Sequence, residues 1–68
     1  MNSDLRFFSY LAKNARKHAI QARKATRKAL AAGKTELAAM HAQSVDFWTR
    51  RRVERLAAIA ALKAELAS

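Results

Sequence analysis

Six basic side chains between residues 13 and 27 are spaced so that they could bind phosphate groups. Separations of three, four and seven residues place side chains on one face of a helix. Lys and Arg along such a face neutralise successive phosphates, and the release of counterions supplies affinity that does not depend on base sequence. We call these residues the basic ridge: Lys13, Arg16, Lys17, Arg23, Lys24 and Arg27. The ridge predicts a surface that binds a polyanion, and it is expected to lie opposite the apolar face of its helix.

The distribution of charge supports this interpretation. The 68 residues include 14 Lys and Arg but only 5 Asp and Glu, which gives a formal net charge of +9. No carboxylate occurs between Leu5 and Thr35. A soluble helix usually mixes its charges, because opposite charges four residues apart attract each other. The alternative is a solvated face that only aids solubility, although mixed charges would serve solubility equally well.

A second group of arginines lies in the other half of the chain. Arg50 stands four residues from both Asp46 and Glu54, a spacing that predicts ion pairs within one helix. The other three members are added to the predicted phosphate contacts: Arg51, Arg52 and Arg55.

Arg52 and Arg55 continue the apolar heptad pattern of the second half, where a buried unpaired charge would be costly. We therefore expect both side chains to reach water or an anion, near Arg16 and Lys17. The alternative is that they snorkel to the bundle surface without a ligand.

The apolar side chains near these arginines allow two interpretations. Trp48, one turn before Arg52, could stack on a base, but its helical spacing from Val45 favours a place in the core. A second apolar stripe lies beside the seam of the same helix and predicts an interface with a partner or a second copy. We call it the apolar stripe: Leu37, Met40 and Phe47.

Two helices must position these side chains. The chain is rich in strong helix formers and has no Pro and one Gly. The hydrophobic phase changes at Gly33, which is typical of a residue that ends a helix, and Thr35 is a candidate N-cap for the next one. We therefore predict an all-α fold, a single domain over 1–68, with helices at about 3–32 and 36–67 and a turn at 33–35.

Folding back at the turn produces an antiparallel hairpin with complementary sides. Small residues such as Ala19 and Ala22 then face Trp48 and Val45. Because a hairpin buries only one stripe of each helix, closure as a homodimeric four-helix bundle is expected, with a monomer as the alternative. The expected architecture resembles in shape the small Rop-type plasmid RNA-binding proteins, which are also short helical hairpins that dimerise.

The chain lacks the motifs of an enzyme, since it has no Gly-rich phosphate loop and no HExxH, and we therefore expect no enzyme activity. No cofactor is implied. Cysteine is absent, and His18 and His41 fall at different levels of the hairpin, so no metal site is expected. No apolar run reaches the length of a membrane span, and no secretory signal is evident. We therefore expect a cytoplasmic protein.

These observations predict a small, non-enzymatic, accessory or regulatory protein that binds DNA or RNA through its phosphate backbone. The first alternative is a protein–protein interaction module, which binds an acidic or helical partner through the basic ridge and the apolar stripe. A lesser alternative is an amphipathic protein at a membrane surface, although the Ala-rich middle of the first helix would insert weakly.

Overall fold

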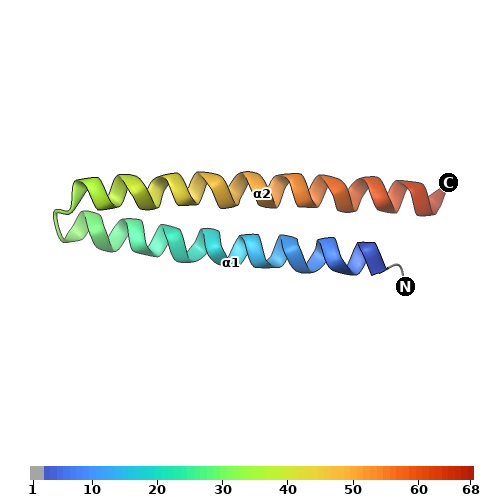
Figure 1. The fold of residues 1–68 in the computed structure, drawn as a ribbon, viewed down its shortest axis with the longest axis horizontal. Coiled ribbons are helices and arrows are strands. Elements are labelled where there is room, and N and C mark those ends of the chain that lie inside the picture. Colours follow the sequence, from blue (N-terminus) through green and yellow to red (C-terminus); the bar gives the residue numbers. More distant parts are fainter. Residues whose placement is uncertain (1–2) are drawn as a thin grey trace.

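The computed structural model describes residues 3–68 and consists of two antiparallel α-helices (Figure 1). Helix α1 spans Ser3–Ala31 and helix α2 spans Thr35–Ala67. The predicted all-α hairpin is confirmed, and both helix ends at the turn lie one residue before the predicted positions. The pair forms a rod whose principal extents are 53 × 15 × 11 Å, with the turn at one end and the first residues of α1 and last residues of α2 at the other.

The turn is a Schellman motif centred on Gly33. Gly33 has φ +73°, which is the left-handed conformation that glycine adopts without strain. Its N–H donates to the carbonyl of Leu30 at 3.0 Å, and the N–H of Lys34 donates to the carbonyl of Ala29 at 2.9 Å. These bonds satisfy carbonyls that the end of α1 would otherwise leave unpaired.

The predicted N-cap of α2 is wrong by one residue. Lys34 occupies the N-cap position and makes no side-chain capping bond, while Thr35 is the first helical residue. Three residues, 32–34, separate the two helices, so the link ends one residue before the predicted N-cap.

The contact between the helices is made of alanines on one side and larger residues on the other. Among residues 3–68, six are buried, and all of them are alanines: Ala12, Ala15, Ala19, Ala22 and Ala29 of α1 and Ala38 of α2. The seam of α2 is half-buried and includes His41, Val45, Trp48, Ile59 and Leu62. Two residues of the predicted seam, Arg52 and Leu66, are exposed. The small face of α1 thus packs on the large face of α2, as predicted.

Ring contacts fix the register halfway along the rod. The imidazole of His18 stacks on the indole of Trp48, with ring centroids 4.4 Å apart and an interplanar angle of 20°. The predicted level of Trp48 opposite the middle of α1 is therefore correct. The ring of Phe47 meets Trp48 edge-on at 5.1 Å, so the indole is held by one residue from each helix.

One side-chain hydrogen bond crosses the seam. The Nη1 of Arg55 donates to the backbone carbonyl of Leu11 at 2.9 Å, in a part-buried setting. One donor of its guanidinium therefore has a partner in the backbone of α1, and the expected contact with water or an anion near Arg16 and Lys17 stays a prediction. A carbonyl can accept this bond in addition to its helical one, because it has two lone pairs.

Replacing Gly33 with Ala should destabilise the hairpin by about 1 kcal/mol, because an L-residue resists the left-handed conformation. A Cβ at this position would meet no atom within 4 Å, so the cost is conformational rather than steric. Gly33→Asn should cost less, since Asn tolerates this conformation better. Urea unfolding followed by circular dichroism measures both variants, and an Ala variant as stable as the parent would contradict the assignment.

Replacing Arg55 with Met should lower the free energy of unfolding by about 1 to 2 kcal/mol, because it removes a charged donor but keeps much of the apolar stem. Arg50→Met is the matched control: Arg50 lies on the same helix, is exposed, and has no side-chain hydrogen bond within residues 3–68. The comparison uses the urea midpoints of both variants. Equal losses would show that the contact with Leu11 contributes nothing specific.

Candidate nucleic-acid interface

All six residues of the basic ridge lie on α1 and are exposed. The helix brings them together because they sit on its flanks, away from the alanines of the seam. The lysines, together with Arg16, border a shallow hollow on the outer surface of α1: Lys13, Arg16, Lys17, Ile20, Gln21 and Lys24.

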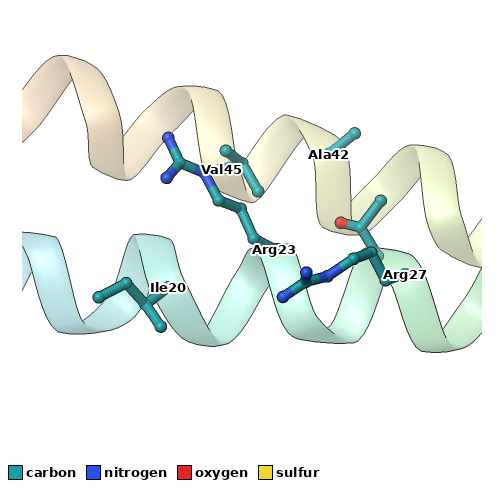
Figure 2. Close-up of a pocket in the computed structure, with 6 residues that line it drawn as sticks. Ile20, Arg23, Arg27, Ala42 and Val45 are labelled. Atoms are coloured by element: carbon teal, nitrogen blue, oxygen red, sulfur yellow. The ribbon is translucent and has the colours of Figure 1, made fainter.

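The ridge does not form a single strip opposite the seam, as the sequence suggested. Arg23 and Arg27 border an open groove between the two helices, with a volume of about 580 Å³. Figure 2 shows the two arginines on α1 beside Ile20, with Ala42 and Val45 on α2 across the groove. The reason is geometric: Arg23 directly follows buried Ala22 and Arg27 directly follows half-buried Thr26, so both flank the helix contact rather than oppose it.

Next to the groove lies a smaller hollow that is bordered by arginines from both helices. It has a volume of about 290 Å³ and is lined by Arg16, Ala19, Ile20, Arg23, Thr49 and Arg52. Arg52 of α2 therefore lies close to Arg16, as predicted. We call Arg16, Arg23, Arg52 and Thr49 the arginine hollow.

Carboxylates are missing from both the groove and the arginine hollow. Within residues 3–68, the structure contains one ion pair, between Arg51 and Glu54 of α2 at 3.2 Å. The basic residues of the ridge have no such partner in the described part of the chain. Their positive potential therefore faces solvent without local neutralisation.

Arg51 has two protein partners on α2. Besides its pair with Glu54, its guanidinium lies over the ring of Phe47, 5.0 Å from the centroid. The predicted pairs of Arg50 with Asp46 and Glu54 are wrong: Glu54 pairs instead with Arg51, three residues before it. A phosphate contact by Arg51 stays a prediction, as does one by Arg55.

Neighbouring rings cover part of the Trp48 indole, which reduces the surface on which a base could stack. His18 covers one face of the indole and Phe47 meets it edge-on, and the side chain is half-buried. The spacing correctly placed the ring against α1, but the side chain is half-buried and does not belong to the buried core. Base stacking by Trp48 stays a prediction.

The apolar stripe is exposed on the other side of α2. Leu37, Met40 and Phe47 are exposed to 40%, 64% and 48%. Met40 and Phe47 each precede a residue on the groove side, Ala42 or Thr49, by two positions. Successive helical residues are about 100° apart, so two residues separated by two positions lie on nearly opposite sides of the helix. The apolar stripe and the groove are thus separate surfaces.

Sequence reasoning missed the uncharged lining of these hollows. Ile20, Thr26 and Thr49 border them, yet none stands out in the sequence. Their heptad positions could have indicated them: Ile20 directly follows the seam residue Ala19, and Thr49 directly follows the seam residue Trp48. Reading the flanks of both helices together would have predicted the groove.

No group of three His, Asp or Glu side chains in residues 3–68 is arranged to hold a metal ion. Neither α1 nor α2 combines the length and the apolar character that crossing a membrane requires.

Comparison with known proteins identifies no relative: the chain matches no protein family, no curated protein and no solved structure.

Proposed function

We propose that this protein binds nucleic acid through the phosphate backbone and acts as a small accessory or regulatory factor. The observation that carries the proposal is the basic ridge, whose six exposed cations have no acidic neighbour on α1 between Leu5 and Thr35 and no ion pair within residues 3–68. A helix without such neutralisation forgoes stabilising pairs, and a polyanion would supply the missing partners.

The dimensions of the ridge suit a duplex. From Lys13 to Arg27 the helix rises about 21 Å. A B-form duplex carries one charge per roughly 1.7 Å of axis, so about a dozen phosphates accompany a segment of this length. The hairpin offers no element of a base-reading motif, and recognition would rest on backbone and shape in DNA or RNA.

The extended surface supports a homodimer. A folded monomer of 7.6 kDa is expected to expose about 4,300 Å², whereas this chain exposes 5325 Å². The excess of about 1,000 Å² resembles the share of one partner in a standard interface, roughly 800 Å². A core of six alanines also leaves the isolated hairpin short of apolar burial.

Charge decides which face would meet the second copy. Packing groove against groove would bring the arginines of both copies together without carboxylates between them, and such a contact is repulsive. The opposite face carries the apolar stripe. A four-helix bundle built on that stripe would leave the basic ridge of each copy open to nucleic acid.

The same stripe also supports a second candidate function. Met40 is exposed to 64%, and an apolar face on a helix is what a helix of another protein would recognise. In this alternative the chain is an interaction module, and the basic ridge meets an acidic surface of its partner.

Binding of labelled duplex DNA, duplex RNA and single strands should weaken steeply with salt. If the six ridge residues each contact one phosphate, the slope of log affinity against log salt for duplex DNA is about −5. Fluorescence anisotropy at several salt concentrations measures it. A flat response would exclude the phosphate backbone as the target.

Reversing the charges of Arg23, Lys24 and Arg27 to Glu should abolish tight binding and reduce the magnitude of the slope by about three. The matched control reverses three basic residues outside the predicted contacts: Arg6, Lys34 and Lys63. Both variants change the net charge equally, and circular dichroism checks their helicity. Equal losses of affinity would mean that net charge alone, and not the ridge, controls binding.

Replacing Leu37 and Phe47 with Ser should convert a dimer to a monomer and make the hairpin easier to unfold, since the stripe would lose its apolar contacts. Light scattering measures the mass. Val53→Ser is the control, because Val53 is an exposed apolar residue of α2 outside the stripe. A parent protein that is monomeric at every concentration would contradict the dimer and favour the interaction module.

A further inference from the structure

We propose that the arginine hollow binds a terminal phosphomonoester of a nucleic-acid strand. This inference rests on the proposed function and adds the class of ligand that one particular site would select. The basic ridge would hold successive backbone phosphates, whereas the hollow would hold the end of a strand.

The hollow gathers cations from both helices at one position. Arg16 and Arg23 come from α1, and Arg52 comes from α2. Figure 2 shows Arg23 extending from α1 across the groove towards α2. Thr49 adds a hydroxyl to the lining, so the site offers up to three guanidinium groups and one neutral donor around a space of about 290 Å³.

The arginines of the hollow differ from neighbouring arginines in their interactions within the protein. Arg51 pairs with Glu54, and Arg55 donates to the carbonyl of Leu11. Arg16, Arg23 and Arg52 have neither a hydrogen bond nor an ion pair within residues 3–68. Three like charges around one hollow repel each other, and a bound anion would turn that repulsion into attraction.

The number of donors favours a monoester over an internal phosphate. A phosphomonoester has a charge near −2 and three oxygens that accept hydrogen bonds strongly. A backbone diester has one charge and two such oxygens. Because guanidinium groups bind phosphate oxygens in a forked geometry, three of them match the three free oxygens of a monoester.

The surroundings of the hollow fit a strand that continues from this end. The open groove beside it shares Arg23 and Ile20 and extends to Arg27. The next phosphate could therefore meet Arg27, while Ile20 and Val45 supply an apolar floor for the first sugar or base. A strand with its terminal phosphate in the hollow would follow the groove towards the turn.

The test compares twelve-nucleotide single strands that carry a 5′-phosphate, a 3′-phosphate or only hydroxyl ends. A fourteen-nucleotide strand with hydroxyl ends matches the total charge of the phosphorylated ones. We expect at least one phosphorylated strand to bind roughly tenfold more tightly than this control, the gain typical of added charge-assisted hydrogen bonds. Equal affinities would overturn the inference while leaving backbone binding intact.

Arg52→Gln should remove the preference for the phosphorylated end, measured within that variant as the ratio of its affinities for phosphorylated and hydroxyl-ended strands, so that a general loss of phosphate contacts cancels. Arg50→Gln is the matched control, since it removes the same charge from α2 but does not line the hollow. Loss of the preference in both variants would assign it to general charge rather than to the hollow. A phosphoserine peptide that binds as tightly as the phosphorylated strand would overturn the choice of a nucleic-acid end. Failure of every strand to bind would overturn the proposed function as well.

Discussion

The packing of an alanine seam on α1 against larger side chains of α2 is the constraint on which the rest of the structure depends. Alanine allows the helices to meet without large side chains from α1, and it buries little apolar area in return. Helix α1 therefore needs few bulky residues, and its flanking and outer positions are free to carry Lys and Arg. Because the alanine seam buries little apolar area, the rod keeps more exposed surface than is usual for its mass, and a further contact surface would add to its stability.

The seam also determines how the charges are divided. Positions on one flank of the seam border the groove between the helices, and positions further round α1 face open solvent. Arginines such as Arg23 and Arg27 occupy the first kind of position, and Lys17 and Lys24 occupy the second. Apart from Arg16, which borders both the outer hollow and the arginine hollow, the arginines and lysines of the ridge thus meet different environments, although the sequence presents both as members of one basic helix.

The sequence predicted the features that depend on local patterns, and it did not predict those that depend on the relative position of the two helices. The hairpin and the alanine seam rest on periodicity and on Gly33, and both are strong local signals. The partner of Glu54 depends on a choice between Arg50 and Arg51 that differ little in energy, because three- and four-residue spacings both allow a contact. The bond from Arg55 to Leu11 requires the position of the other helix, which no local pattern specifies. The groove was not predicted because its lining residues come from both helices, and it becomes apparent only when the flanks of both helices are read together.

The division between arginine and lysine has a mechanistic consequence under the proposed function. Lysine is a strongly hydrated point charge, and on the open face it would act mainly at a distance, raising the rate of encounter with a polyanion. Arginine is planar and less hydrated, and beside the apolar floor of the groove it would lose less on contact with phosphate. Encounter and docking would then depend on different residues. Exchanging the arginines that border the groove for lysines would keep the long-range field of α1 and lose the forked contacts, so dissociation would become faster while association changed little.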